Sequence, residues 1–199
     1  MGGSLILASS SAVRRRLLEG ARVPFQVVGS HVDEARIKVD CKSKKLSLAE
    51  TTMILARAKA NDVGKDHPDD LVLGADQALI CGEEWFDKPA GRDGVRAHLM
   101  QLQGRAHELV NSSVVVQGGT VVWEHQDAIT MVMRPLSEVF IEAYINEAGD
   151  AVCESVGGYQ LEGIGAQLFD RTDGDFFSIL GLPLLRLLVF LRARGIVAA

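Results

Sequence analysis

Apolar residues along the chain fall into two kinds of pattern, which together predict strands interspersed with helices. Short apolar runs are typical of buried strands, and apolar residues three or four positions apart are typical of helices. The predicted strands cover residues 4–8, 24–28 and 71–76. The predicted helices cover residues 11–20, 47–62, 93–103 and 137–147. This mixture indicates an α/β protein.

Several local signals refine this pattern. Ser47 and Glu50 form a capping box at the start of the second helix. Gly118-Gly119, between two β-branched runs, predicts a hairpin of two long strands. The glycine-rich segment 157–165 predicts a functional or tightly turned loop, and Pro183 predicts the start of a buried C-terminal helix.

Three adjacent arginines stand where the first helix should begin. Ser10 or Ser11 is the expected N-cap, so Arg14 and its two neighbours fall within the first turns. A helix N-terminus carries partial positive charge, so cations there are unfavourable unless an anion lies among them. A strand, a serine-rich turn and a helix N-terminus predict an anion site, although a solvated helix face is the alternative.

Composition and charge narrow the function classes. With 199 residues, 47% of them hydrophobic, and a net charge of −5, the chain is expected to be globular and soluble rather than a binder of nucleic-acid polymers or of anionic membranes. Residues 1–60 nevertheless carry eleven Lys or Arg against five Asp or Glu, which suits a small, highly charged anion. Three widely spaced cysteines support neither a disulfide framework nor a zinc site and fit a cytoplasmic location.

Charged residues scattered along the chain form the candidate chemistry, because P-loop, Rossmann, HExxH and GxSxG motifs are all missing from the sequence. Carboxylates that hold Mg²⁺ or Mn²⁺ and accept a proton, with cations to neutralise phosphates, suit phosphoanhydride hydrolysis. Each residue also has a structural alternative, as a polar loop, a turn or a helix C-terminal cation. The candidates are Asp33-Glu34, Lys59, Asp76 at the end of its strand, and Lys88-Pro89.

Taken in order, these pieces resemble the Maf family of septum-formation-inhibitor-like nucleoside triphosphate pyrophosphatases. LASSSAVRRRLL matches the opening motif of the family, and its DE, AKA, GAD and KP motifs follow at the candidates above. GRAHE, GGYQLEG and GD followed by GLPL complete a match over nearly the whole chain. The resemblance implies one domain over residues 1–199, with a Maf/inosine-triphosphatase-like fold: an elongated mixed sheet flanked by helices, in two lobes with a central cleft.

The resemblance also implies a reaction and a set of roles. Water attacks the α-phosphorus of a nucleoside triphosphate, and a monophosphate and pyrophosphate leave, with a divalent metal (Mg or Mn) required. Asp76 is then the catalytic carboxylate, acting as general base or through the metal, and Glu34 is its metal-binding companion. A homodimer is also implied. The residues expected to hold the triphosphate are Ser9, Ser11, Arg14, Lys59 and Lys88.

Three positions bear on the nucleobase. Gln77 and Glu162 are similar to the branch that acts on 7-methylguanosine triphosphate, whereas the dTTP/UTP branch has threonine and glutamine there. A carboxylate suits the N–H donors of a guanine edge and the charge of a methylated purine. Val13 departs from the aromatic residue of that branch. A broad or dTTP/UTP-type pyrophosphatase is the alternative enzyme, and a nucleotide-binding regulator of cell division is the alternative of another class.

Overall fold

The computed structural model describes residues 4–198, and the chain divides into two compact units. Unit 1 contains the residues up to Asp76, Asn111–Asp127 and those from Phe176 on. Unit 2 contains Gln77–Val110 and Ala128–Asp175. The chain therefore passes from one unit to the other inside three of its strands.

Unit 1 contains three parallel strands, β1, β2 and the first part of β3, with helices on both of their faces. Its elements are β1 (Leu5–Leu7), α1 (Ala12–Gly20), β2 (Phe25–Val27), α2 (Glu34–Ser43), α3 (Leu48–Gly64), the first part of β3 (Leu71–Cys81), the ends of β5 (Ala106–Gln117) and β6 (Thr120–Met133) that meet at their turn, α6 (Phe176–Ile179) and α7 (Leu184–Ala193). Strand β1 pairs in parallel with both β2 and β3. Parallel strands of this kind are buried on both faces, which explains the uninterrupted apolar run of β1.

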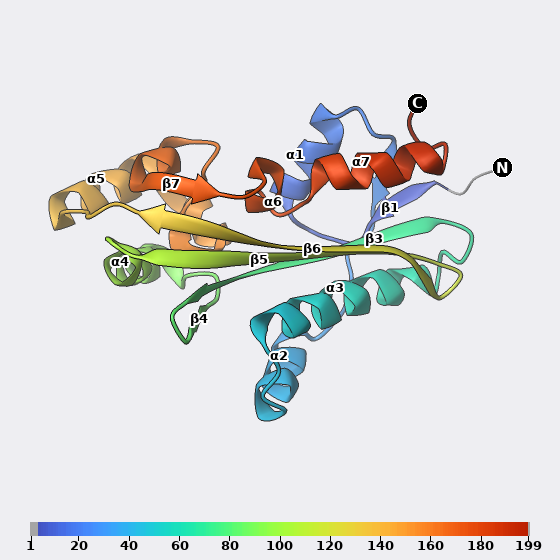
Figure 1. Ribbon diagram of the computed structural model, residues 1–199, viewed down its shortest axis with the longest axis horizontal. Coiled ribbons are helices and arrows are strands. Elements are labelled where there is room, and N and C mark those ends of the chain that lie inside the picture. Colours follow the sequence, from blue (N-terminus) through green and yellow to red (C-terminus); the bar gives the residue numbers. More distant parts are fainter. Residues whose placement is uncertain (1–3, 199) are drawn as a thin grey trace. The chain divides into compact units, whose positions relative to one another are not determined.

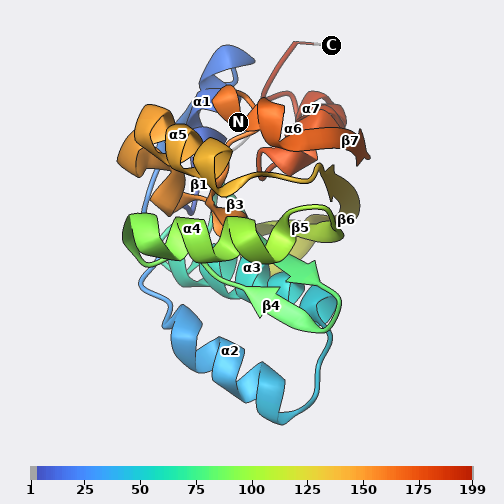
Figure 2. The same ribbon diagram turned by 90° about the vertical axis from the view of Figure 1, so that its left-hand side faces the viewer.

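Two apolar clusters cover the two faces of these strands. On one face, Leu5 and Leu7 pack with α1 and α7. On the other face, Ile6 and Val72 pack with Ala56 and Ala60 of α3. Figure 1 shows α7 and α3 on opposite sides of β3, as this alternation requires. Figure 2 shows α2 on the far side of α3 from the strands.

Unit 2 contains an antiparallel part of the sheet and its own helices. Its elements are the second part of β3, β4 (Glu84–Phe86), α4 (Gly91–Leu102), the remaining parts of β5 and β6, α5 (Glu138–Ala148), short 3-10 segments at Gly149–Glu154, Val156–Gly158 and Ile164–Leu168, and β7 (Phe169–Asp173). Strand β4 pairs antiparallel with β3, and β7 pairs antiparallel with β6. Within the described residues, the strands form one seven-stranded sheet in the order β2-β1-β3-β5-β6-β7, with β4 off this path on β3.

The expected α/β class, with a mixed sheet flanked by helices, is confirmed. Ser11 is the N-cap of α1, and Ser47 and Glu50 make both bonds of the predicted capping box. The hairpin turns at Gly118 and Gly119, whose φ values of 56° and 75° are the left-handed conformations that a two-residue hairpin turn requires. Among the helices of residues 4–198, none has the length and apolar character needed to cross a membrane.

One sequence-based expectation was wrong, and one helix was not predicted. The strand predicted over 71–76 continues to Cys81, so Asp76 lies inside β3 and not at its end. The continuation is stabilised by antiparallel pairing of Leu79–Cys81 with β4, a tertiary contact that the apolar run 71–76 does not reveal. Helix α2 was not predicted, because within it only Cys41 is buried and its apolar spacing is therefore weak.

A buried polar cluster lies within the core of unit 2. His107 on β5 and Tyr159 of the glycine-rich segment are both buried, and a hydrogen bond of 2.8 Å joins His107 Nε2 to the Tyr159 hydroxyl. Tyr144 on α5 donates to the carbonyl of Gly158 (3.1 Å). Burial, and next to it the charge of Arg105, lowers the pKa of His107 from 6.5 to about 4. His107 is therefore neutral in the folded protein at pH 7.

This pKa predicts a loss of stability in mild acid. The unfolded chain protonates this histidine near pH 6.5 and the folded protein only near pH 4, so stability is lost as the pH falls through this window. Between pH 7.5 and pH 5, the unfolding free energy should therefore fall by roughly 2 kcal/mol less in His107→Gln than in wild type. Urea unfolding at the two pH values measures it. His31→Gln, at a side chain that is 95% exposed, is the control, and an equal decrease in wild type and His107→Gln would contradict the prediction.

Candidate functional site

Arg14 is the buried member of the arginine cluster. Its Nε donates to the carbonyl of Gly181 (2.8 Å), and its Nη1 donates to the carbonyl of Ala75 (3.0 Å) and to Ser9 Oγ (3.1 Å). Its guanidinium is therefore fixed between the first turn of α1, strand β3 and the turn before α7. Burial lowers the pKa of Arg14, and the charges of Asp76 and Glu34 oppose this effect. The other two arginines of the cluster, by contrast, are exposed.

The two serines predicted to bind phosphate take part in the same turn. Ser11 Oγ accepts from the backbone N–H of Arg14 (3.3 Å), and Ser9 Oγ accepts from the backbone N–H of Ser11 (3.3 Å). Both hydroxyls act as acceptors in these bonds. Each retains its O–H as a donor, which is the group that a phosphate oxygen would accept from.

A close approach of α3 to β3 at Gly74 positions the centre of the site. A Cβ added to Gly74 would lie 2.3 Å from the carbonyl oxygen of Ala56 and 2.7 Å from the backbone nitrogen of Ala60. Only glycine allows helix and strand to come this close. Lys59 precedes Ala60, and Asp76 lies two residues beyond Gly74 on the same face of the strand.

Lys59 and two carboxylates form the charged centre. The Lys59 Nζ lies 2.8 Å from Asp76 Oδ1 and 2.9 Å from Glu34 Oε2. The side chains of Lys59 and Asp76 are 8% and 9% exposed, whereas that of Glu34 is 46% exposed. Lys59 lies inside α3, five residues before its end at Gly64, so it is not the helix C-terminal cation that was the alternative interpretation.

The pKa of Asp76 is raised by burial, and the charges of Lys59 and Arg14 and the hydrogen bond from Lys59 pull it back. Glu34 contributes in the opposite sense, since a second carboxylate disfavours ionisation of the first. Raised pKa values of this kind, at a buried carboxylate held by a specific cation, are characteristic of functional sites.

The Asp33-Glu34 pair begins α2. Asp33 is its N-cap and accepts from the backbone N–H of Arg36 (3.0 Å), while Glu34 is its first residue. The two carboxylates therefore have different roles: Asp33 caps the N-terminus of α2, and Glu34 pairs with Lys59. A polar loop, the alternative interpretation of the pair, is not what the chain forms.

Four predicted residues take no part in the contacts described above for Arg14, Lys59 and the carboxylates. Val13 is half-buried on α1 in unit 1. In unit 2, Lys88 is exposed and its Nζ pairs with Glu154 Oε2 at 3.0 Å. Gln77 follows Asp76 in β3. Glu162 lies exposed in a turn within the glycine-rich segment, where its charge helps to raise the pKa of Tyr144, although burial has the larger effect. The roles assigned to these residues stay predictions.

Sequence reasoning missed the main-chain part of the site. The carbonyls of Ala75 and Gly181 fix Arg14, and both belong to the motifs GAD and GLPL. A motif signals that such positions matter, but which backbone oxygen faces a guanidinium depends on the tertiary fold. Within residues 4–198, no group of three or more His, Cys, Asp or Glu side chains is arranged to hold a metal ion. The Glu34 and Asp76 pair is thus the carboxylate set at this centre.

Comparison with known proteins identifies the family of this chain. The family model described as Maf-like protein matches residues 4–194. The chain belongs to the Maf family. A protein named nucleoside triphosphate pyrophosphatase from Paramagnetospirillum magneticum is 48% identical over 190 residues, covering 96% of this chain and 98% of that protein. These matches confirm the family and the enzyme class that the motifs predicted.

The comparisons also found a second named relative and a solved structure. A protein from Mesorhizobium japonicum named 7-methyl-GTP pyrophosphatase is 42% identical, covering 98% of this chain and 98% of that protein. A solved structure of a nucleoside-triphosphatase / dITP/XTP pyrophosphatase from Mycobacterium abscessus superimposes with a TM-score of 0.45 at 16% identity, covering 96% of this chain and 95% of that one.

The contact at Gly74 predicts that this Maf protein does not tolerate a methyl group there. Gly74→Ala should reduce the unfolding free energy by about 1–3 kcal/mol or more, because backbone atoms of α3 must move. Chemical denaturation measures it. Gly29→Ala is the matched control, because a Cβ at Gly29 meets nothing within 4 Å. Wild-type stability in Gly74→Ala would show that α3 is not held against β3 as described.

Proposed function

We propose that this Maf protein hydrolyses the α–β phosphoanhydride of a nucleoside triphosphate to the monophosphate and pyrophosphate, in a house-cleaning role, and that 7-methylguanosine triphosphate is its favoured substrate. The observation that carries the reaction is the buried Asp76 carboxylate, held by Lys59 beside the fixed guanidinium of Arg14. The proposed hydrolysis requires a group that accepts the proton of water and groups that stabilise negative charge on the phosphates. Asp76 suits the first requirement, and Arg14 and Lys59 suit the second.

Each residue of unit 1 has a task in this reaction. Asp76 accepts the proton of the attacking water, for which its raised pKa suits it. Arg14 presents a rigid positive charge to the phosphates, and Lys59 adds a movable one. The hydroxyls of Ser9 and Ser11 donate to phosphate oxygens at the N-terminus of α1.

Glu34 and Asp76 suit a divalent cation, Mg²⁺ or Mn²⁺. Their oxygens both contact the single nitrogen of Lys59, so they are close enough to share one ion. Mg²⁺ is commonly held by one or two carboxylates together with substrate phosphates and water, which matches a set of two. Such an ion would neutralise charge that develops on the phosphates.

The base preference is assigned to Gln77 and Glu162. It is supported by the relative named 7-methyl-GTP pyrophosphatase, which is 42% identical over nearly the whole chain. A carboxylate at Glu162 pairs well with guanine N–H donors and with the positive charge of a methylated ring. Lys88 is assigned to the triphosphate, which requires it to leave its exposed pair with Glu154. Exposed pairs of this kind contribute little stability and exchange readily.

Both units are proposed to act as one domain over residues 1–199, and the protein as a homodimer in the cytoplasm. The domain assignment is supported by β3, β5 and β6, each of which begins in one unit and ends in the other. A nucleic-acid polymer as substrate is not proposed, because a net charge of −5 does not favour one.

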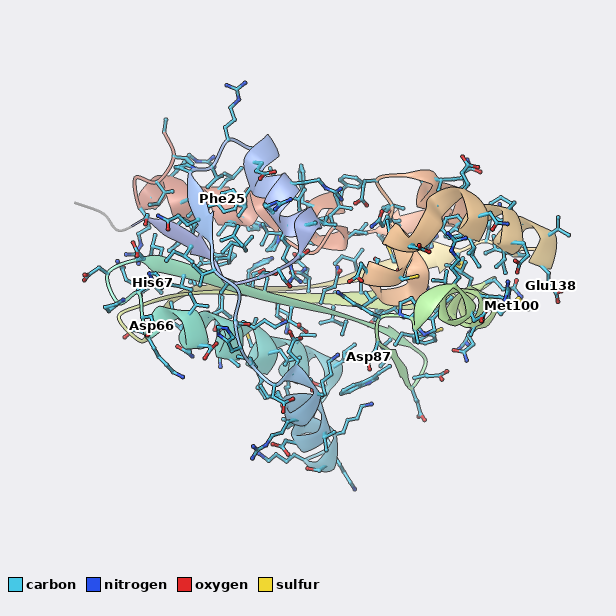
Figure 3. The ribbon with its side chains drawn as sticks, turned by 180° about the vertical axis from the view of Figure 1, so that it is seen from behind. Phe25, Asp66, His67, Asp87, Met100 and Glu138 are labelled. Atoms are coloured by element: carbon cyan, nitrogen blue, oxygen red, sulfur yellow. The ribbon has the colours of Figure 1, made fainter. Side chains whose placement is uncertain are left out.

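Asp76→Asn tests the reaction. Removing the proton acceptor should lower kcat by about 10²–10⁴-fold with little change in thermal stability. The measurement is chromatography of products from 7-methylguanosine triphosphate, GTP, UTP, dTTP, CTP and ATP with Mg²⁺. Asp66→Asn is the control, at an exposed aspartate in the turn after α3 (Figure 3). Nucleotide binding without turnover in wild type would favour a regulator of cell division instead, and a near-normal rate in Asp76→Asn would remove Asp76 from catalysis.

Glu162→Gln tests the base preference. The variant should lose selectivity for 7-methylguanosine triphosphate over UTP by about tenfold or more, since it loses a charge-assisted pair, while kcat for UTP stays close to that of wild type. Values of kcat/KM over the same panel measure it. Glu138→Gln, at an exposed position at the start of α5 (Figure 3), is the matched control. Equal use of all nucleotides by wild type would favour the broad pyrophosphatase.

A further inference from the structure

The position between Glu34 and Asp76 is taken by a cation that belongs to the chain itself. Lys59 Nζ contacts an oxygen of each carboxylate, at 2.9 and 2.8 Å, and the lysine side chain is almost fully buried. The contacts described for this ammonium group go to those two carboxylates. A divalent ion that binds both oxygens must therefore displace Lys59 or compete with its charge.

The charges of the free site balance. Arg14 and Lys59 supply two positive charges, and Glu34 and Asp76 supply two negative charges. A free divalent ion thus meets a neutral cluster with a cation already at its centre. Once a triphosphate is present, its negative charges offer Lys59 another partner and leave both carboxylates to the metal.

We propose that Lys59 is an internal counter-ion that excludes free divalent cations, so that metal and nucleotide enter together as the metal–nucleotide complex. This inference rests on the proposed function, because it names the form in which the substrate enters. Lys59 thereby has two positions: on the carboxylates in the free protein and on the triphosphate in the complex.

The different anchoring of the two cations supports this. Arg14 is fixed by two main-chain carbonyls and a serine, so its guanidinium does not shift when an anion arrives. Lys59 is bound only through the terminal nitrogen of a flexible four-carbon stem, whose point charge can turn to a new acceptor. Glu34 is about half exposed, which leaves the carboxylate pair open to an ion from solvent.

The test measures Mn²⁺ binding to the nucleotide-free protein. Electron paramagnetic resonance detects the free ion during the titration. Lys59→Met should bind Mn²⁺ about 10- to 100-fold more tightly than wild type, because a unit positive charge a few Å from the ion is removed. Lys65→Met is the matched control, since this lysine at the C-cap of α3 is exposed and pairs with Asp62 at 3.8 Å. Adding Glu34→Gln to Lys59→Met should abolish the gain and so locate the ion.

Circular dichroism establishes that the variants are folded, and Lys59→Gln, which keeps a donor toward Asp76, replaces Lys59→Met if that variant is not. Equal Mn²⁺ affinity of wild type and the folded variant would overturn the inference. So would saturation of the free wild-type site at roughly micromolar Mn²⁺, a result that needs no variant.

Turnover of the nucleotide panel is measured on the same wild-type preparation. Turnover together with equal Mn²⁺ affinities overturns the entry order alone. Absence of turnover on every nucleotide overturns the proposed function, and the entry order with it, whatever the Mn²⁺ curves show.

Discussion

The close packing of α3 on β3 at Gly74 is the constraint on which the candidate site depends. Backbone atoms of α3 occupy the space where a side chain at residue 74 would lie. The helix therefore lies close enough to β3 for Lys59 to reach Asp76. The small side chains of Ala56 and Ala60 allow α3 to approach β3 closely, and Lys59 lies beside them on the same helix. A buried lysine or a buried aspartate without a partner would cost folding free energy. Because the two charges are in contact, each offsets part of the cost of burying the other.

Arg14 is a buried cation at the N-terminus of a helix. A cation at the start of a helix opposes the macrodipole, and in this chain main-chain carbonyls from two distant segments offset that cost. Because those carbonyls come from Ala75 and Gly181, the guanidinium also ties α1 to β3 and to the turn before α7. The same contacts that stabilise the buried charge therefore make it rigid, whereas Lys59 is held through one atom. On the proposed function, a fixed cation and a movable one beside two carboxylates would let the centre be neutral without a nucleotide and bind a triphosphate.

Local signals were sufficient where structure is local. Ser11, and Ser47 with Glu50, cap their helices through bonds that span three residues, so sequence spacing alone reveals them. Strand β7 and helix α2 expose most of their side chains, and no apolar period marks them. The extension of β3 beyond Asp76 depends on β4. For the candidate site, the motifs named Arg14, Lys59 and Asp76. The burial of Lys59 and the choice of Ala75 and Gly181 as acceptors depend on contacts between segments far apart in sequence.

The division of the chain separates the two tasks that the proposed reaction sets. Arg14, Lys59 and Asp76 belong to unit 1, where main-chain carbonyls hold Arg14 and the side chains of Lys59 and Asp76 pair with each other. Glu162 belongs to unit 2, next to a segment anchored by Tyr144 on the Gly158 carbonyl and by His107 on Tyr159. The contacts described for Arg14, Lys59 and Asp76 come from residues of unit 1. Under the proposed function, base recognition and phosphate chemistry use residues of different units, and residue 162 is where we expect the base preference of this chain to be set.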